Sequence, residues 1–237
     1  MITVQNLTKV YGKNKVLDDI TVQFSEGVIY GLVGANGCGK TTLMRCICGF
    51  SRPTEGYVVV NGCFIGRRKD AARASHVDGD VPSPFERIAD FAPSTGVIIE
   101  EPGFLPSETG MKNLMLLASM SGRADRARAK EVMELLGLNP DEKKPVGKYS
   151  LGQRQRMGFA QAFMENPNVL ILDEPFNAMD KASMAEVHGL LQKFKSEGKI
   201  IILASHSSAD IEKACDVVFE MESGGLTQIK GQVAGKN

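Results

Sequence analysis

GANGCGKTT, residues 34–42, decides the fold of this chain. An apolar run at residues 28–33 precedes it, and a helix-compatible run at residues 43–48 follows it. The glycines let the backbone turn so that successive N–H groups face one concavity, and the start of the next helix adds partial positive charge there. A strand, a G-x-x-x-x-G-K-T loop and a helix in this order predict a phosphate-binding loop that holds a nucleotide.

The side chains that end this loop suit a magnesium nucleotide. Lys40 supplies a full positive charge for the β- and γ-phosphates, and the hydroxyl of Thr41 is a ligand for Mg²⁺. Thr42 comes next and reaches the α-phosphate. A glycine-rich turn that only resembles the motif is the minor interpretation, because both flanks also fit.

Composition bounds the remaining possibilities. The chain has 237 residues, 43% of them hydrophobic, which is enough for one large domain with a sizeable core. Its formal net charge of zero gives no sign of bulk electrostatic binding to nucleic acid. No run approaches the roughly 20 apolar residues of a membrane span, and the first residues lack a secretory signal. We expect the cysteines to be reduced core residues, with Cys38 in the loop as a site open to oxidation.

The rest of the chain alternates between strands and helices. Near-continuous apolar strands between amphipathic helices predict a parallel sheet covered on both faces. Residues 104–165 are mostly helical and form a candidate subdomain, whereas residues 66–93 form an irregular surface excursion. We expect strands near 2–7, 20–24, 57–60, 97–99, 169–172, 199–204, 217–221 and 226–229, and helices near 111–118, 132–136, 183–196 and 210–215. Asn61–Gly62 predicts a hairpin turn after the strand at 57–60, and we expect Gly224–Gly225 to join the last two strands.

Two further segments place chemistry at strand ends. The apolar run 169–172 ends in Asp173 and Glu174, and the run 201–204 leads to His206. In a parallel α/β sheet, ligands bind at the carboxyl ends of the strands. Asp173 therefore suits the Mg²⁺ hydration shell, and Glu174 suits the attacking water. A plain Asp-Glu-Pro turn and a structural histidine are the weaker alternatives.

A third segment surrounds Ser150. A small polar residue and Gly152 precede a helix there, which can present N–H groups and a hydroxyl to an anion. An ordinary serine N-cap explains the same residues equally well.

Together these motifs resemble the ATP-binding cassette ATPases, the nucleotide-binding subunits of ABC transporters, over essentially the whole chain. Residues 34–42 match the Walker A loop, and residues 170–174 match Walker B with its catalytic glutamate. Residues 150–153 look like the family signature, and residues 177–180 resemble the D-loop. The resemblance implies an α/β phosphate-loop NTPase fold of ABC type, in one domain spanning residues 1–237. Such a fold has a mostly parallel core sheet, an antiparallel β subdomain and a helical subdomain.

The resemblance assigns catalytic roles to two residues and a metal to three. Glu174 is the catalytic glutamate, and His206 is the switch histidine at the γ-phosphate. Mg²⁺ is expected on Thr41, Asp173 and Glu100.

The resemblance also assigns the residues that contact the nucleotide. From its own stretch Tyr11 is a packing residue at a strand end, but the family places an aromatic there that stacks on adenine. The residues expected to bind ATP are Tyr11, Val16, Gly34, Asn36, Gly37, Gly39, Lys40, Thr41 and Thr42. Those expected to face the ATP of a second subunit are Ser150, Gly152 and Gln153.

Three positions depart from the usual family pattern. Tyr149 and Leu151 replace the first and third residues of the L-S-G-G-Q signature, and Glu100 stands where a glutamine is usual. Glu100 can still ligate Mg²⁺ but adds negative charge near the phosphates. These departures look like those of the branch that exports bacitracin and lantibiotics.

The resemblance thus implies an ATPase that powers export of a peptide, antibiotic or lipid-like substrate. Its expected partners are a transmembrane permease and a second ATPase subunit, with no nucleic acid, at the cytoplasmic face of the membrane. A soluble ABC ATPase that acts on ribosomes or DNA is the alternative, and a phosphate-loop kinase or GTPase is a weaker one.

Overall fold

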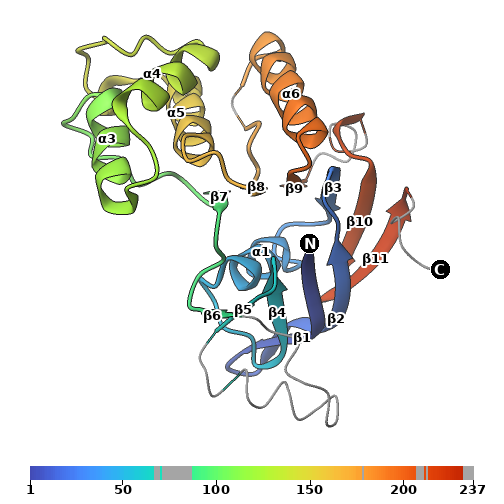
Figure 1. Cartoon of the computed structure of the whole chain (residues 1–237). Coiled ribbons are helices and arrows are strands. Elements are labelled where there is room, and N and C mark those ends of the chain that lie inside the picture. The colour runs from blue at the N-terminus through green and yellow to red at the C-terminus, as the bar shows by residue number, and fades with distance from the viewer. Residues whose placement is uncertain (67–69, 71–86, 178, 207–210, 212, 232–237) are drawn as a thin grey trace. The chain divides into compact units, whose positions relative to one another are not determined.

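The structure, a computed structural model, describes residues 1–66, 70, 87–177, 179–206, 211 and 213–231 (Figure 1). The chain divides into two compact units. The first unit comprises Met1–Pro93 and Ile200–Asn237, and the second comprises Ser94–Lys199.

Strands dominate the described part of the first unit. They form an antiparallel group in the order β2-β1-β4-β5, to which β6 adds in parallel, and a second group in the order β11-β10-β3-β9. In the second group β10, β3 and β9 are parallel, and β11 is an antiparallel edge. The elements are β1 (Ile2–Tyr11), β2 (Asn14–Phe24), β3 (Val28–Val33), α1 (Lys40–Cys48), β4 (Glu55–Val60), β5 (Cys63–Ile65), β6 (Arg87–Ala89), β9 (Ile200–Ser205), β10 (Val217–Glu222) and β11 (Gly225–Lys230).

A β-bulge explains the spacing of apolar residues in β1. Val4 and Leu7 are both fully buried although they lie three positions apart, which breaks the two-residue period of a strand. The register with β2 shifts between them, and Asn6 takes a left-handed conformation with φ of 46°. The extra residue turns Leu7 back toward the core.

Two predicted hairpins are present. Asn61 and Gly62 have φ of 50° and 72°, and they join β4 to β5, as the Asn-Gly pair predicts. The β10–β11 turn lies at Ser223–Gly224, whereas we expected it at Gly224–Gly225, which was wrong by one residue. Gly225 already pairs with Glu222 in the ladder.

The described residues of the excursion at 66–93 include a strand that the sequence did not reveal. Strand β6 is three residues long and lies parallel to β5, which is too short to produce a periodic pattern. Residues 67–69 and 71–86 lie outside the described part, as does most of the helix expected at 210–215.

Four α-helices and a pair of parallel strands make up most of the described part of the second unit. Helices α3, α4 and α5 pack against one another, and β7 pairs with β8. The elements are β7 (Thr95–Ile98), α3 (Gly110–Ser121), α4 (Arg126–Leu135), the 3-10 helix η1 (Val146–Lys148), α5 (Leu151–Phe163), β8 (Val169–Asp173) and α6 (Lys181–Ser196).

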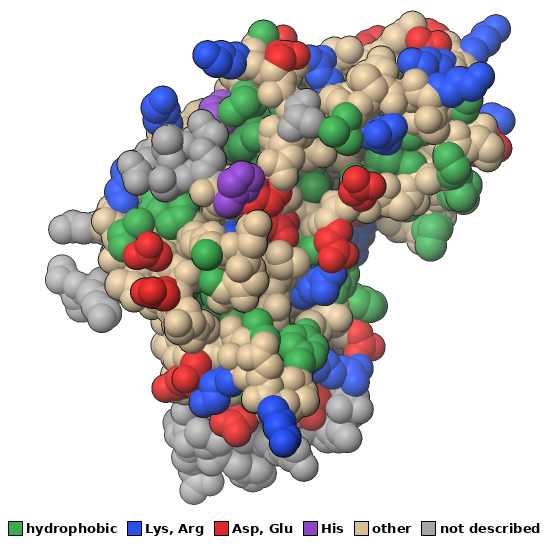
Figure 2. Space-filling model, turned by 180° about the vertical axis from the view of Figure 1, so that it is seen from behind, with side chains coloured by type: hydrophobic (Ala, Val, Ile, Leu, Met, Phe, Trp, Pro, Cys, Tyr) green, Lys and Arg blue, Asp and Glu red, His purple; other side chains and the backbone are tan. Residues whose placement is uncertain are grey.

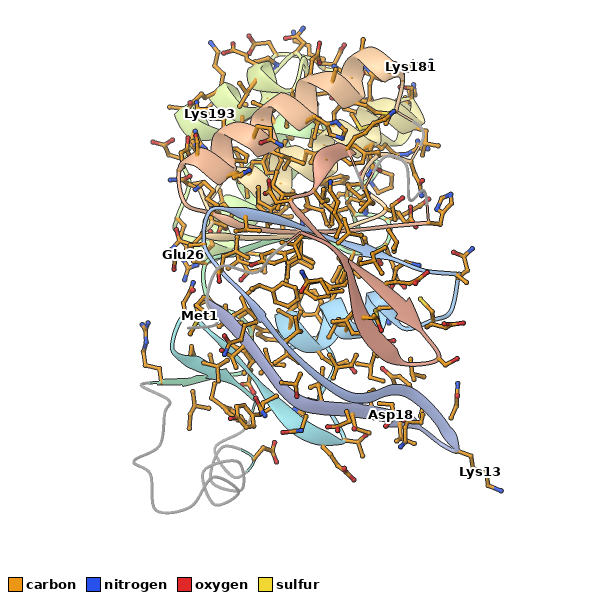
Figure 3. The ribbon with its side chains drawn as sticks, turned by 90° about the vertical axis from the view of Figure 1, so that its right-hand side faces the viewer. Met1, Lys13, Asp18, Glu26, Lys181 and Lys193 are labelled. Atoms are coloured by element: carbon orange, nitrogen blue, oxygen red, sulfur yellow. The ribbon has the colours of Figure 1, made fainter. Side chains whose placement is uncertain are left out.

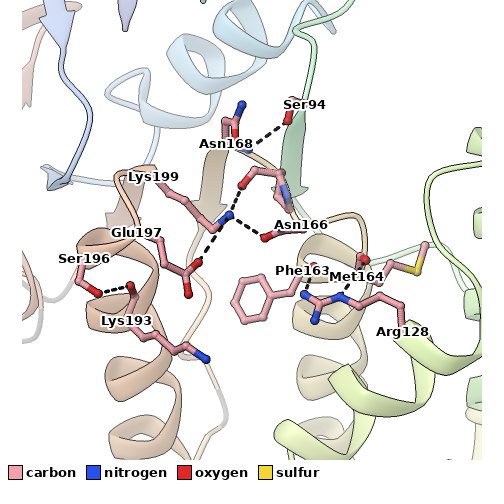
Figure 4. Close-up of polar contacts among 11 residues, drawn as sticks. Ser94, Arg128, Phe163, Met164, Asn166, Asn168, Lys193, Ser196, Glu197 and Lys199 are labelled. Atoms are coloured by element: carbon pink, nitrogen blue, oxygen red, sulfur yellow. Dashed lines mark hydrogen bonds and ion pairs between the residues drawn. The ribbon is translucent and has the colours of Figure 1, made fainter.

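Two cations stabilise the connection between α5 and β8 (Figure 4). Arg128 donates to the carbonyls of Met164 and Phe163 at 3.3 and 3.4 Å, at the end of α5, where the last carbonyl oxygens have no partner within the helix. Lys199, which is buried, donates to Asn166 Oδ1 at 2.7 Å and to the Pro167 carbonyl at 3.0 Å. Burial lowers the pKa of Lys199, and the loop before β8 is fixed by its contacts.

The cysteines divide as expected. Cys46, Cys48, Cys63 and Cys215 are buried thiols, and Cys38 is half-buried in the loop. Burial raises the pKa of Cys46 to about 11 and that of Cys48 to about 12, so both stay protonated at neutral pH. The prediction of core thiols is confirmed for these four.

Candidate functional site

The loop at residues 34–39 follows β3 and depends on glycine at three places. Gly34, Gly37 and Gly39 have φ of 150°, 81° and 115°, which side chains of L-residues rarely adopt. A Cβ atom on Gly39 would also lie 2.9 Å from the carbonyl oxygen of Val16. The loop therefore closes tightly against the β1–β2 hairpin, and Val16, an expected ATP-binding residue, lies beside it.

Lys40 is held inside this loop. It is 93% buried, and its Nζ donates to the carbonyl of Gly34 at 2.6 Å and to that of Ala35 at 3.2 Å. Helix α1 begins at Lys40, and its N-cap Gly39 has no side chain to cap the first N–H groups. An ammonium beside an uncapped helix N-terminus fits the phosphates of a nucleotide.

Tyr11 lies at the end of β1, and Lys13 marks the tip of the following turn in Figure 3. The Tyr11 side chain is 48% exposed, and its hydroxyl lies 3.0 Å from Ser51 Oγ. The Nζ of Lys9 lies 4.7 Å from the ring centroid. The ring is thus an exposed platform rather than a core residue, contrary to what its own stretch favours.

His206 leaves the sheet at the same edge as the phosphate loop. Val33 and Ser205 are partners in the parallel β3–β9 ladder, so Gly34 and His206 are the next residues on neighbouring strands. The His206 side chain is exposed. This placement, expected from the strand pattern, is confirmed within the first unit.

A second group of polar residues lies in the second unit, where β7 and β8 end together. Ile98 pairs with Leu172, so Glu100 lies just after β7 and Asp173 is the last residue of the neighbouring β8, at the same edge. A pocket of about 450 Å³ opens there, which we call the carboxylate pocket. It is lined by Glu100, Glu101, Pro102, Phe104, Leu151, Arg154, Gln155, Asp173, Glu174 and Asn177.

Two of the carboxylates stand on unusual backbone. Glu100 and Glu174 have φ of 62° and 46°, the left-handed region that non-glycine residues seldom occupy. Each such residue costs roughly 1–3 kcal/mol and persists where the surroundings fix it, often at functional sites. Nothing in the local sequence indicates this conformation for either glutamate.

The start of α5 is an N-terminal capping box. Ser150 Oγ accepts from the Gln153 backbone N–H at 3.2 Å, and Gln153 Oε1 accepts from the Ser150 N–H at 3.0 Å. This is the capping arrangement that we gave as one of two explanations. The anion-binding explanation stays open. The Ser150 hydroxyl accepts the cap hydrogen bond through Oγ, and its own proton can still be donated to an anion. Gly152 is partly exposed in the first turn of the helix.

Sequence reasoning missed several residues of the carboxylate pocket. Phe104, Arg154 and Gln155 come from a loop and from α5, and they meet Glu174 only in the fold. Gln155 makes a direct contact, donating from Nε2 to the carbonyl of Pro175 at 2.7 Å. Its position five residues after Ser150 was the only available signal.

No group of three or more His, Cys, Asp or Glu side chains that could hold a metal ion occurs within the ranges that the structure describes. The expected ligands Glu100 and Asp173 share the carboxylate pocket, and Thr41 is in α1 of the first unit.

Among the described residues, none of the helices has the length and hydropathy of a membrane span.

A glycine loop between a parallel strand and a helix, with its lysine directed into the loop, defines a phosphate-loop NTPase. The sequence matches the ABC transporter family over residues 17–177, and the chain belongs to this family. It is accordingly an ATP-binding and ATP-hydrolysing subunit of an ABC transporter, as the resemblance predicted.

Similar proteins include ATP-binding subunits of known transporters. The chain is 35% identical to the bacitracin transport ATP-binding protein BcrA of Enterococcus faecalis, over 96% of this chain and 68% of that protein. It is 31% identical to the lantibiotic transport ATP-binding protein SrtF of Streptococcus pyogenes, over 92% of this chain and 85% of that protein. It is also 38% identical to YybJ, an uncharacterized ABC transporter ATP-binding protein of Bacillus subtilis, over 95% of this chain and 94% of that protein.

Solved structures share the fold at lower identity. An ATP-binding subunit of an ABC transporter superposes with a TM-score of 0.79 at 23% identity, over 97% of this chain and 90% of that one. The dimeric bacterial ABC transporter cassette MJ0796 superposes with a TM-score of 0.78 at 22% identity, over 98% of this chain and 100% of that one. The expected α/β phosphate-loop fold of ABC type is confirmed.

Proposed function

We propose that this chain powers the export of a peptide antibiotic or a similar substrate, through a separate permease at the cytoplasmic face of the membrane. The carboxylate pocket carries the ATP-driven part of the proposal, because it gathers Glu100, Asp173 and Glu174 at the ends of two parallel strands. Similarity to bacitracin and lantibiotic transport subunits supports the substrate class. The departures at Tyr149, Leu151 and Glu100 point the same way.

The phosphate loop binds the triphosphate of ATP. Backbone N–H groups around Asn36, Gly37 and Gly39 and the uncapped start of α1 offer hydrogen-bond donors. Lys40, which now donates to two loop carbonyls, exchanges them for phosphate oxygens. Thr42 follows Lys40 and Thr41 in the first turn of α1, and we assign its hydroxyl to the α-phosphate.

Adenine stacks on Tyr11. The exposed ring offers a flat surface, and Val16 lies beside Gly39 of the loop, between the ring and the phosphates along the hairpin. A strong preference for GTP over ATP would contradict this assignment.

Thr41, Asp173 and Glu100 hold magnesium in this proposal. A hydroxyl and two carboxylates supply only hard oxygen ligands, which is the donor set that Mg²⁺ prefers. When bound, Mg²⁺ neutralises charge on the phosphate oxygens.

Glu174 performs the hydrolytic step. Its carboxylate orients a water and accepts its proton as the water oxygen bonds to the γ-phosphorus. The bond from that phosphorus to the bridging oxygen breaks, and ADP leaves with the electron pair. His206 donates a hydrogen bond to the γ-phosphate from the edge where the loop also begins.

A second ATPase subunit completes each site. Ser150, Gly152 and Gln153 would contact the ATP held by the other subunit, and the exposed start of α5 suits this role. We further propose that residues 1–237 act as a single cassette domain, with the helices near residues 104–165 as its helical subdomain.

The ribosome or DNA alternative has no observation in its favour. On the face drawn in Figure 2, basic and acidic side chains are interspersed, without a continuous basic field that nucleic acid would need. The similar proteins named above are transporter subunits.

Affinity purification from native membranes tests the proposal. We expect a multi-span permease to copurify with the tagged chain, and the complex to hydrolyse ATP faster when bacitracin or a lantibiotic is added. Copurification with ribosomes or DNA, and no permease, would contradict it. The variant Lys40→Ala is the control for nucleotide-dependent activity.

A further inference from the structure

Gln155 connects α5, the helix that begins with the signature residues 150–153 and is called the signature helix below, to the turn at residues 174–177 within the second unit. It lies in α5, five residues after Ser150. Its Nε2 donates to the carbonyl oxygen of Pro175 at 2.7 Å, and the side chain is partly buried in the carboxylate pocket. Pro175 is the residue directly after Glu174, so this hydrogen bond acts on the Pro175–Phe176 peptide, one residue past the proposed base.

The turn at Glu174 needs external support. Glu174 has φ of 46°, and a residue before proline is also sterically restricted. Such a conformation persists only where surrounding contacts fix it. Within the turn, the Asn177 N–H donates to the Glu174 carbonyl at 3.3 Å, which is a long and weak hydrogen bond.

Other contacts of the turn lie further along the chain. The ring of Phe176 meets His188 edge-on at a centroid distance of 4.6 Å and lies 6.4 Å from Phe159. These apolar contacts hold the turn against α5 and α6. The Gln155 amide instead fixes the direction of the Pro175 carbonyl. Because the proline ring locks φ, this hydrogen bond also restrains the backbone that carries the Glu174 side chain.

We propose that Gln155 is a positioning residue that holds Glu174 in its hydrolytic orientation and links it to the start of the signature helix. This inference rests on the proposed function, in which Glu174 is the base and Ser150 contacts the second subunit's ATP. Ser150 caps α5 and Gln155 lies in its second turn, so about 7 Å of regular helix joins them. If the start of α5 shifts when the two subunits assemble, the Gln155 amide, which donates to the Pro175 carbonyl, therefore moves with it.

The variant Gln155→Met tests the proposal, because methionine keeps the length of the side chain and removes the donor. We expect kcat for ATP hydrolysis to fall about three- to tenfold, the size of one hydrogen bond, with KM changed by less than about twofold. Gln192→Met, on the exposed side of α6, is the matched control and should keep the wild-type kcat. Gln155→Asn, whose amide is one methylene too short, should behave like Gln155→Met.

A double variant separates positioning from general stability. If Gln155 acts through Glu174, then Gln155→Met should cause no further loss of turnover in the Glu174→Gln background. Loss by the same factor in both backgrounds, a parallel rise in KM, or wild-type kcat in Gln155→Met and Gln155→Asn would each overturn the proposal.

The same series shows whether the proposed function fails instead. Near-normal turnover in Glu174→Gln alone would remove Glu174 as the base. A strong loss in Glu174→Gln with wild-type turnover in Gln155→Met would overturn only the role of Gln155.

Discussion

The phosphate loop of the first unit and the carboxylate pocket of the second unit are built in different ways. The loop and the first residues of α1 are nine consecutive residues, 34–42, whose main feature is backbone, with Lys40 closing the loop through two carbonyls. The pocket is assembled from three separate segments, around residues 100–104, 151–155 and 173–177. The difference indicates a division of labour in which the loop provides affinity for the nucleotide and the pocket provides turnover. Variants that separate binding from turnover test this division.

The largest effect is expected for Glu174→Gln. Loss of the general base should reduce kcat by roughly 10²–10⁴-fold, while the Kd for ATP stays close to wild type. Steady-state phosphate release and equilibrium titration with a fluorescent ATP analogue measure the two quantities. A variant that also binds ATP much more weakly would break the division between loop and pocket.

Lys40→Ala should act on binding instead. Charge-assisted hydrogen bonds to phosphate contribute about 1.5–3 kcal/mol, so the Kd for ATP should rise roughly 10- to 100-fold. Calorimetric titration of ATP measures it, with Lys193→Ala, an exposed residue of α6, as the control. Unchanged affinity in Lys40→Ala would exclude the loop as the main phosphate site.

Glu100→Gln should have a smaller and more specific effect. Removing a charge from this exposed position should lower KM for ATP about two- to fivefold and raise by a similar factor the Mg²⁺ concentration needed for half-maximal activity. Magnesium titrations at fixed ATP measure the shift, and Glu101→Gln is the matched control. Equal effects of both variants would show that Glu100 acts only through general charge.

The smallest effect is expected for Cys38→Ala. The Sγ of Cys38 lies 3.9 Å from Lys40 Nζ, a weak contact, and the loop binds phosphate through backbone groups. The Kd for ATP should change by less than about twofold. A larger change would mean that side chains of the loop other than Lys40 and the threonines contribute to affinity.

Particular elements show where sequence reasoning succeeded and failed. Strand β8 and the Asn61–Gly62 turn were predictable, because four buried residues and an Asn-Gly pair act through local propensity. Strand β6 was missed, since a three-residue strand is defined only by its partner. The start of β11 was predicted one residue too late, because Gly225 already pairs with Glu222. The left-handed Glu174 was equally hidden, because tertiary contacts rather than propensity maintain it.

The sequence by itself determined the phosphate loop, the strand ends that carry Asp173, Glu174 and His206, and membership in the ABC family. These depend on torsions and periodicities within short segments, which neighbouring residues specify. Only the tertiary structure decided that Gln155 bonds to Pro175 and shares a pocket with Glu100. The pocket requires the chain to pass one place three times, and packing of the whole second unit, not any one segment, specifies where those passes meet.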